Sequence, residues 1–372
     1  MKLLICTSEY FPHGSGIANV VFNVVEQLKK QGVECTVCSP TGPDITLGNK
    51  QFIEKFGFLG LIYYWHQVSH FFKHTDYDVV WLQNPYFIYH NPFHRCLITM
   101  HSTYFGLSHH NVGNTRFLQV YYKIISAIEE FSLAQLSKKT VFTGVGQPVC
   151  EELEKMGIEK ERITYVPNGV DVQSFNPALD KTILRKKIGV PNNNIILLSV
   201  GRLTPQKGTQ TLIEVFSLLE KSLGNLTLCI AGKGELLDSA KILVKKNGLQ
   251  KVIFLGYVDE RDLPALYAGS DYYIINSIYE GGMPPLTLSE AMASGLPCIV
   301  SDIPNFSIVN DAGCGLIVNF GNIDHAAKEI LEYLSREHQD HAKNARNYTI
   351  QFLDWEIISK EYLKIFERLI MQ

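Results

Sequence analysis

Short, almost continuously apolar segments recur along the chain, each followed by a stretch with helical periodicity. The first, LLICTSE, precedes a pattern over residues 17–31 in which Val20, Val24 and Leu28 share one helical face. Strands that are apolar on both faces occur in parallel sheets covered by helices on each side. The alternation therefore predicts an α/β fold built from right-handed strand–helix–strand units.

Two such domains are expected, because 372 residues is about twice the usual size of one domain. The polar stretch 176–194 is the best linker, so we expect a first domain over 1–175, a second over 190–353 and an amphipathic helix over 355–372. The remaining strands of the first half are expected at ECTVCSP, DVVWLQN, CLITMHS, TVFTGVG and ITYVPNG. Those of the second are expected at IILLSVGR, LTLCIAGKG, VIFLGYV, DYYIINS, PCIVSD and GLIVN.

Composition excludes several classes of protein. A net charge of −3 gives no general attraction to nucleic acid. No apolar run approaches the ~20 residues of a membrane span, and the opening MKLLICTSEYF lacks a signal-peptide cleavage pattern. Most cysteines lie in apolar strands, which indicates a reducing, cytoplasmic environment. Cys35 and Cys38 form a C-x-x-C motif within one strand, where their side chains face opposite ways, so zinc is not expected.

The segment EGGMPPLTLSEAMASG places Glu280 and Glu290 beside a glycine- and proline-rich loop that opens a helix. It follows the strand DYYIINS, and ligands of parallel α/β sheets bind at the carboxyl ends of strands. A helix N-terminus suits an anion, whereas a carboxylate suits hydroxyl groups. Together they indicate a sugar nucleotide, although a glutamate on a helix is more often a surface residue.

Two further strand ends carry candidate residues. Gly14 and Gly16, in PHGSGIANV, allow a ligand close to a helix start, although the same pattern occurs in ordinary tight turns. A nicotinamide dinucleotide site would need a third glycine at Asn19 and an acidic residue after the next strand, and neither is present. His101 ends CLITMHS and could bond a sugar hydroxyl or be an ordinary histidine.

GRLTPQKG contributes two cations at a loop–helix junction. Arg202 ends a strand and Lys207 precedes the next helix. An arginine fork and a lysine point charge can neutralise a diphosphate, although two basic loop residues are often simply solvated.

Taken in order, YVPNGVD, GRLTPQKG, IAGKGE, LGYVDERDLPALYAGSD and SIYEGGMPPLTLSEAMASGLPCIVSD resemble the retaining glycosyltransferases of family 4, also called group 1 glycosyl transferases. The likeness covers nearly the whole chain and is looser in the N-terminal half. It implies the GT-B fold, with two Rossmann-like domains facing a cleft, an acceptor-side first domain, a donor-binding second domain and a C-terminal helix crossing back to the first.

The resemblance also implies roles for individual residues. Arg202 and Lys207 would bind the pyrophosphate of a nucleoside-diphosphate sugar, and Glu290 would bind its ribose hydroxyls. The loop containing Gly14 and Gly16 would lie under the phosphates or the acceptor.

Glu280 would contact the transferred sugar and His101 would lie near it, both with catalytic roles. Gly281 and Gly282 could present backbone N–H groups to the sugar or phosphate. The stretch between Glu280 and Glu290 is longer than is usual in the family, which leaves the role of Glu280 open.

The implied reaction moves a hexose-type unit to an acceptor hydroxyl on a glycan, a lipid-linked molecule or a small molecule, with anomeric configuration retained. No cofactor or essential metal is expected, because the D-x-D letters at Asp76 and Asp78 precede a strand and lie at the opposite sheet edge. A sugar-nucleotide epimerase of the same fold and a non-catalytic sugar-nucleotide-binding subunit are the alternative functions.

The stretch 52–74, FIEKFGFLGLIYYWHQVSHFFKH, is rich in aromatic and basic residues. It could be an interfacial helix that makes peripheral contact with the inner face of a membrane, or a helix packed on the sheet. Some of its aromatic residues could instead line an acceptor groove.

Overall fold

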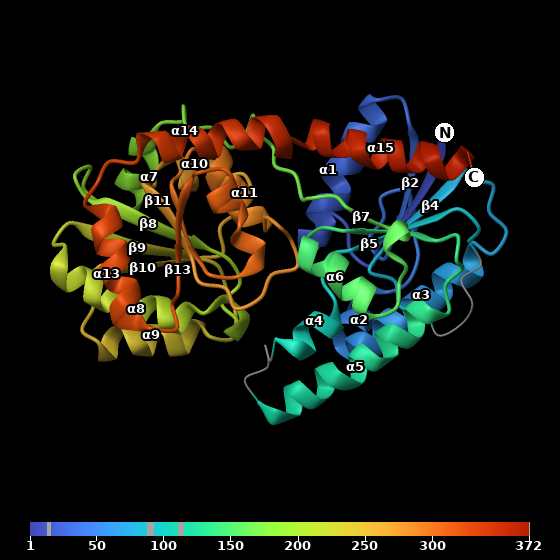
Figure 1. The fold of residues 1–372 in the computed structure, drawn as a ribbon, viewed down its shortest axis with the longest axis horizontal. Coiled ribbons are helices and arrows are strands. Elements are labelled where there is room, and N and C mark those ends of the chain that lie inside the picture. Colours follow the sequence, from blue (N-terminus) through green and yellow to red (C-terminus); the bar gives the residue numbers. More distant parts are fainter. Residues whose placement is uncertain (13–15, 88–92, 111–114, 372) are drawn as a thin grey trace. The chain divides into compact units, whose positions relative to one another are not determined.

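The computed structural model describes residues 1–12, 16–87, 93–110 and 115–371, which group into two compact units (Figure 1). Unit 1 contains residues 1–169, the short segment 281–283 and the chain from Trp355 onward. Unit 2 contains residues 170–280 and 284–354. Both are α/β units with a parallel sheet, so the predicted fold class is confirmed.

Unit 1 follows the strand–helix alternation expected from its sequence. Its strands are β1 (Lys2–Cys6), β2 (Glu34–Ser39), β3 (Ile45–Thr46), β4 (Val79–Gln83), β5 (Cys96–Met100), β6 (Val141–Gly144) and β7 (Ile163–Tyr165). Its helices are α1 (Gly16–Lys30), α2 (Lys50–Phe56), α3 (Phe58–Phe71), α4 (Tyr104–His109), α5 (Arg116–Ala134), α6 (Gln147–Lys155) and α15 (Trp355–Met371).

The sheet of unit 1 has the strand order β3-β2-β1-β4-β5-β6-β7. Successive strands are added toward one edge up to β3 and toward the other edge from β4 onward, so the order reverses between β1 and β4. Helices α1 and α15 cover one face, and α3 and α5 lie on the other (Figure 1). Trp81 of β4 packs against Tyr362 and Phe366 of α15, with ring centroids 4.8 and 5.6 Å away. The apolar stripe of the C-terminal helix is thereby buried in unit 1.

Unit 2 repeats the pattern. Its strands are β8 (Ile195–Val200), β9 (Leu226–Ala231), β10 (Val252–Gly256), β11 (Tyr272–Ile275), β12 (Cys298–Ser301) and β13 (Gly315–Val318). Its helices are α7 (Lys181–Ile188), α8 (Thr209–Ser222), α9 (Leu237–Lys246), α10 (Leu263–Ala268), α11 (Leu286–Ala293), α12 (Ile308–Asp311), α13 (Ile323–Leu334) and α14 (Gln339–Tyr348).

No helix in the part of the chain described here is both long and apolar enough to cross a bilayer.

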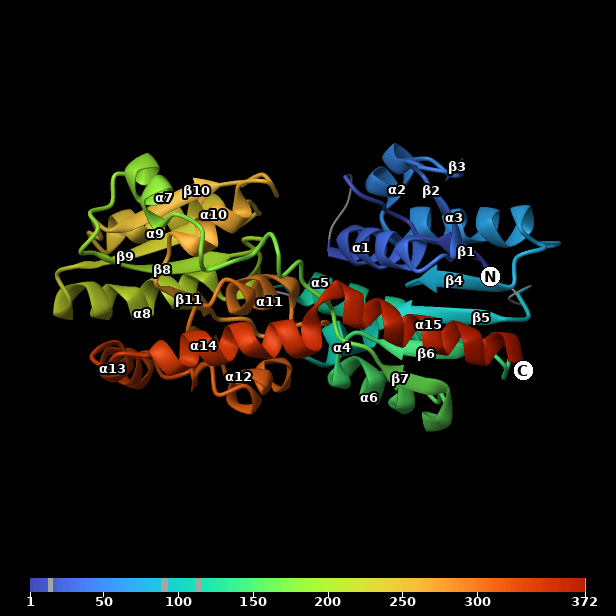
Figure 2. The same ribbon diagram turned by 90° about the horizontal axis from the view of Figure 1, so that it is seen from above.

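The sheet of unit 2 has the order β10-β9-β8-β11-β12-β13 and reverses between β8 and β11 (Figure 2). Strand β8 pairs with β9 as far as Val200, but with β11 only through Leu197 and Leu198. The two strands therefore separate before β8 ends. This topological switch point is the place where open α/β sheets bind ligands.

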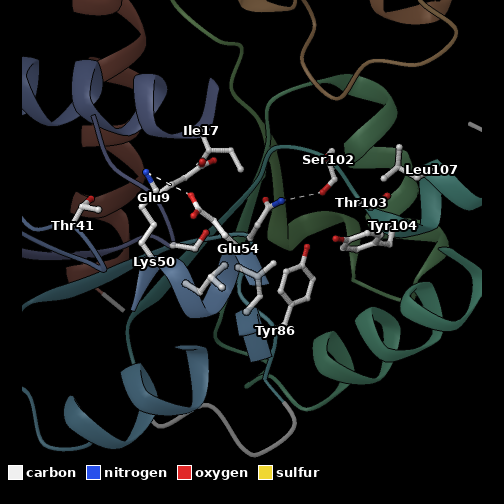
Figure 3. A pocket seen from close by; sticks show the side chains of 14 residues that line it. Glu9, Ile17, Thr41, Lys50, Glu54, Tyr86, Ser102, Thr103, Tyr104 and Leu107 are labelled. Carbon is white, nitrogen blue, oxygen red and sulfur yellow. Dashed lines mark hydrogen bonds and ion pairs between the residues drawn. The ribbon is translucent and has the colours of Figure 1, made fainter. Parts of the chain in front are cut away.

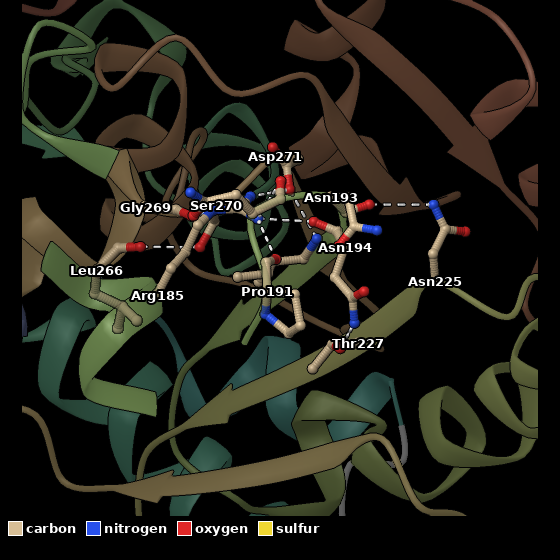
Figure 4. A network of polar contacts seen from close by, with 12 residues as sticks. Arg185, Pro191, Asn193, Asn194, Asn225, Thr227, Leu266, Gly269, Ser270 and Asp271 are labelled. Carbon is tan, nitrogen blue, oxygen red and sulfur yellow. Dashed lines mark hydrogen bonds and ion pairs between the residues drawn. The ribbon is translucent and has the colours of Figure 1, made fainter. Parts of the chain in front are cut away.

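The polar stretch expected as a linker contains α7 and is part of unit 2. Arg185 of α7 is buried and donates to the carbonyl oxygens of Pro191, Asn192, Asn194 and Gly269 (Figure 4). Its Nη2 also lies 2.5 Å from Oδ2 of Asp271, immediately before β11. The same Asp271 oxygen accepts a hydrogen bond from Ile196 N at 2.8 Å, at the start of β8. One guanidinium thus anchors the segment that leads into the central strands.

We predict that Arg185→Gln destabilises unit 2 by about 3–5 kcal/mol, because it leaves a carboxylate and several carbonyls without their buried partner. Thermal unfolding of wild type and variant measures this loss in the free energy of unfolding. Lys187→Gln, which removes an exposed cation from the same helix, should change stability by less than ~0.5 kcal/mol. Similar small shifts for both variants would show that the network does not anchor α7.

Candidate active site

The carboxyl ends of β8 and β11 carry the candidate donor-binding residues of unit 2. Arg202 follows β8 directly, and Lys207 closes the short 3-10 turn Pro205–Lys207 before α8. The segment ending at Glu280 follows β11, and Glu290 lies on α11, which comes next. As expected from the sequence, Arg202 follows a strand, Lys207 precedes a helix and Glu290 lies on one.

Lys207 and Glu280 form an ion pair at this switch point, although 73 positions separate them in the chain. Both side chains are largely buried, with relative exposures of 16% and 7%. The Glu280 carboxylate also accepts a hydrogen bond from Ser277 Oγ at 2.6 Å, and its backbone carbonyl accepts from Asn305 Nδ2 at 2.8 Å. Two donors therefore hold Oε1 of Glu280, which fixes the carboxylate in place.

The backbone around this pair is closely packed. Gly208 begins α8 with φ +55°, and a Cβ at this position would lie 2.2 Å from the carbonyl oxygen of Asn276. Gln206 is bonded twice to the segment after β11, accepting from Ile278 N and donating to the carbonyl oxygen of Tyr279. Only glycine fits at 208 without moving one loop away from the other. The loops after β8 and β11 thus form one rigid structure.

Arg202 is exposed, and among the described residues its guanidinium has no ion-pair partner. It lines the same small recess as Lys207, Thr209 and Ile275. An unpaired guanidinium beside a held ammonium suits a dianionic group, which Arg can bind through two parallel hydrogen bonds.

Glu290 lies beside different partners. Its Oε2 accepts a hydrogen bond from the Tyr267 hydroxyl at 2.7 Å, and the same hydroxyl lies 3.1 Å from the carbonyl oxygen of Thr287. Burial raises the pKa of the Glu290 carboxyl to about 7, and the nearby Glu260 adds to the increase. A carboxylate whose charge is poorly solvated gains from any hydroxyl donors that a ligand brings.

In unit 1, His101 follows β5 and is held on two sides. Its Nε2 lies 2.8 Å from Gln83 Oε1, and its backbone N donates to Asn84 Oδ1 at 2.7 Å. Burial lowers the pKa of the imidazole to about 3, so the ring is neutral at physiological pH. His101 can therefore donate or accept a hydrogen bond, but it cannot supply a positive charge.

The glycines predicted to lie near a ligand differ in their burial. Gly281 is buried, and a Cβ there would lie 1.9 Å from the carbonyl oxygen of His101. Gly282 is also buried, and the adjoining Met283 N donates to Val145 O at 2.9 Å. Gly16 is exposed and opens α1, whereas Gly14 lies outside the described residues.

A pocket of about 570 Å³ lies at the switch point of unit 1, lined by residues of the segments that follow β1, β4 and β5 (Figure 3). It is lined by polar groups, among them Glu9, Lys50 and Asn84, and by aromatic rings, among them Tyr86 and Tyr104. Asn84 has a positive φ of 45°, which directs its side chain between Ser102 O and His101 N. The pocket can hold a molecule with both hydroxyl and apolar groups.

Asp76 and Asp78 lie at the other edge of this sheet. Asp78 precedes β4, and its Oδ2 accepts from Lys2 N at 2.8 Å. Within the described ranges, no group of three or more His, Cys, Asp or Glu side chains is arranged to hold a metal ion.

Several supporting residues were missed in the sequence analysis. Ser277, Asn305 and Tyr267 orient the two glutamates, and Gln83 orients His101. Ser277 could have been found, because it ends the segment DYYIINS that was predicted as a strand before Glu280. The other three contact their partners only through long-range packing, which leaves no local pattern.

Solved structures show the same fold. WaaG, a glycosyltransferase of lipopolysaccharide biosynthesis, matches with a TM-score of 0.79 at 20% identity, covering 98% of this chain and 99% of that one. Anabaena HepE, solved in complex with UDP-glucose, matches with a TM-score of 0.75 at 17% identity, covering 99% and 100%. The fold is therefore GT-B, with two Rossmann-like units.

Sequence profiles identify the family. The profile for glycosyl transferases group 1 matches residues 180–352, and that for glycosyltransferase family 4 matches residues 14–174. The chain belongs to this family. An Escherichia coli UDP-Gal:α-D-GlcNAc-diphosphoundecaprenol α-1,3-galactosyltransferase is 33% identical over 46% of the chain. The match spans 45% of that relative, and the chain spans about half the length of the curated relatives matched first.

The raised pKa of Glu290 predicts a pH dependence of stability. The carboxyl binds its proton more tightly in the folded state, with a pKa of about 7, than in the unfolded state, with a pKa of about 4.5. The contribution of Glu290 to the free energy of unfolding is therefore complete below pH ~4.5 and is lost as the pH rises toward 7. The melting temperature of Glu290→Gln should rise relative to wild type across this window and level off above it. A constant difference between the two melting curves would contradict the burial argument.

Proposed function

We propose that the protein transfers a sugar from a nucleoside-diphosphate sugar to an acceptor hydroxyl with retention of anomeric configuration. The observation that carries this proposal is the buried Lys207–Glu280 pair beside the unpaired Arg202 at the switch point of unit 2. It combines cations for a diphosphate with a carboxylate for sugar hydroxyls. Family membership supports the same activity.

We assign the donor to unit 2. Arg202 and Lys207 bind the diphosphate, whose charge increases as the glycosidic bond breaks, so they stabilise the transition state more than the ground state. Glu290, oriented by Tyr267, accepts hydrogen bonds from the ribose hydroxyls. A structural neighbour solved with UDP-glucose makes this nucleotide sugar a suitable first candidate.

Retention is assigned to front-face attack rather than to a covalent sugar–enzyme intermediate. The Glu280 carboxylate is already engaged by Lys207 and Ser277, which makes it a poor nucleophile and a good anchor for sugar hydroxyls. The acceptor proton passes to the departing phosphate oxygen. His101, kept neutral by burial, positions a hydroxyl through a hydrogen bond.

We assign the acceptor to the unit 1 pocket. Hydrogen-bonding groups such as Glu9, Lys50 and Asn84 suit a hydroxyl-bearing molecule, and Tyr86 and Tyr104 offer faces on which sugar rings or apolar groups can pack (Figure 3). The acceptor class is a glycan or a lipid-linked glycan. Because the described cysteines form no disulfide, we place the reaction in the reducing cytoplasm.

Arg202→Gln tests the donor site directly. Removing one charge-assisted contact costs about 2–3 kcal/mol, so kcat/KM for the sugar nucleotide should fall about 30- to 150-fold. The melting temperature of the ligand-free protein should not change, because Arg202 is exposed and unpaired. Arg336→Gln removes a comparable exposed arginine of unit 2 and should leave turnover within twofold of wild type.

The donor itself is found by thermal-shift screening of nucleoside diphosphates and their sugars. Unchanged turnover in Arg202→Gln would contradict the site assignment. Conversion of the sugar nucleotide without any acceptor would indicate an epimerase instead. Nucleotide binding by wild type without turnover toward any acceptor tested would indicate a non-catalytic binding subunit.

We also propose that transfer needs no metal ion. Activity after exhaustive EDTA treatment should match that of the untreated enzyme, because Arg202 and Lys207 supply the positive charge. Asp78→Asn should also retain activity, since Asp78 bonds the backbone at Lys2. A loss of activity in EDTA that Mg²⁺ or Mn²⁺ restores would overturn this proposal.

A further inference from the structure

Helix α5 presents an apolar stripe to solvent. Phe117, Val120, Ile124 and Phe131 follow helical spacing on one face, and each is more than half exposed, Phe117 to 82%. The opposite face, with Ile125 and Leu133, packs into the core of unit 1. At 1.5 Å per residue the stripe is about 21 Å long. Extended exposed apolar surfaces of this kind mark interaction sites.

An aromatic cluster on α2 and α3 is a second exposed apolar surface of the same unit. Phe52 lies with its ring centroid 4.5 Å from Phe56 and 5.3 Å from Tyr63, and all three side chains are exposed. The ammonium of Lys55 lies 5.6 Å from the Phe56 ring centroid. Figure 1 shows α2, α3 and α5 on the side of the sheet opposite α1 and α15.

Cations outnumber carboxylates on the helices that carry both surfaces, although Lys50 is paired with Glu54, with its Nζ 3.7 Å from Oε1. The exposed cations in these segments are Lys50, Lys55, Arg116 and Lys123, whereas the exposed carboxylates are Glu54 and Glu130. Burial raises the pKa of the Glu129 carboxyl to about 8, so this buried group adds little negative charge at neutral pH. The whole chain carries a net charge of −3, so the excess of cations is specific to this region.

The same helices also form the unit 1 pocket. Helix α2 contributes Lys50 and Ile53 to the pocket, while its Phe52 and Phe56 are exposed. Helix α4, which lines the pocket through Tyr104 and Leu107, packs against α5. A pocket flanked by exposed apolar helices suits an acceptor whose polar end enters the protein while its apolar tail stays in a bilayer.

We propose that the α5 stripe and the α2–α3 aromatic cluster form a docking surface for an anionic lipid bilayer, which brings a lipid-linked acceptor to the unit 1 pocket. Exposed aromatic and aliphatic side chains enter the headgroup–acyl boundary, and the surrounding cations bind anionic headgroups. The choice of acceptor rests on the proposed function, whereas the docking surface rests on the exposed residues alone.

Co-sedimentation of the protein with vesicles tests the docking surface. Wild type should bind phosphatidylcholine vesicles that contain phosphatidylglycerol more strongly than pure phosphatidylcholine vesicles. Phe117→Gln/Ile124→Gln should lower the partition coefficient at least ~10-fold, because two apolar side chains no longer enter the bilayer. The matched control Ile183→Gln/Ile242→Gln, on exposed positions of α7 and α9, should change it less than twofold.

Charge is tested separately. Arg116→Gln/Lys123→Gln should remove most of the preference for anionic vesicles, whereas Lys245→Gln/Lys246→Gln on α9 should preserve it. Circular dichroism and melting temperatures should be unchanged in all variants, since every substituted side chain is exposed. Absence of wild-type binding to both kinds of vesicle would overturn the proposal, as would equal losses in the α5 variant and its control.

Sedimentation velocity tests whether a second copy of the chain, instead of a bilayer, covers this surface. A wild-type dimer that Phe117→Gln/Ile124→Gln converts to a monomer, without vesicle binding, would overturn the bilayer proposal. Turnover with a water-soluble acceptor keeps the two proposals apart. This turnover should be unchanged in the α5 variant if only docking is lost. If wild type binds vesicles but shows no turnover, the proposed function is rejected and the docking surface is not.

Discussion

The separation of two parallel strands, β8 and β11, is the constraint on which the candidate site depends. A doubly wound sheet reverses its strand order once, and at that point the loops on either side turn away from each other. In unit 2 the loops carry opposite charges, so the Lys207–Glu280 pair forms across the opening. Gly208 allows this arrangement because a larger residue would collide with Asn276.

The ion pair has an energetic consequence. Two largely buried charges cost desolvation free energy that their attraction offsets only when other polar groups complete the site. Ser277 donates to the same carboxylate, whereas Arg202 remains unpaired among the described residues. The site is therefore preorganised around Glu280 and retains an exposed cation, which is the combination that a diphosphate-linked sugar needs.

Much of the fold could be predicted from sequence because its signal is local. Apolar strands such as DVVWLQN and IILLSVGR are buried on both faces and appear as β4 and β8. His101 and Arg202 were then predicted as site residues because each lies at the end of a predicted strand. Polar composition was less informative over 176–194, where Arg185 anchors α7 through contacts with distant residues. Composition cannot distinguish a buried, fully paired arginine from a solvated one.

The exposed stripe of α5 shows a different limit. Apolar residues lie on both faces of this helix, so its periodicity does not reveal that Ile125 is buried while Phe117 is in solvent. Likewise, nothing local in the sequence pairs Lys207 with Glu280 or turns Asn84 toward His101. These features arise from tertiary packing, and they determine the chemistry of both candidate pockets.

Hydrogen–deuterium exchange of the full chain, with and without a nucleoside-diphosphate sugar found by screening, shows where the donor binds. If the donor binds at the switch point of unit 2, exchange should slow in peptides covering 201–208 and 276–290 and change little at the opposite edge of the unit 2 sheet. Protection confined to other segments, at ligand concentrations that saturate binding, would contradict the placement of the donor at this switch point.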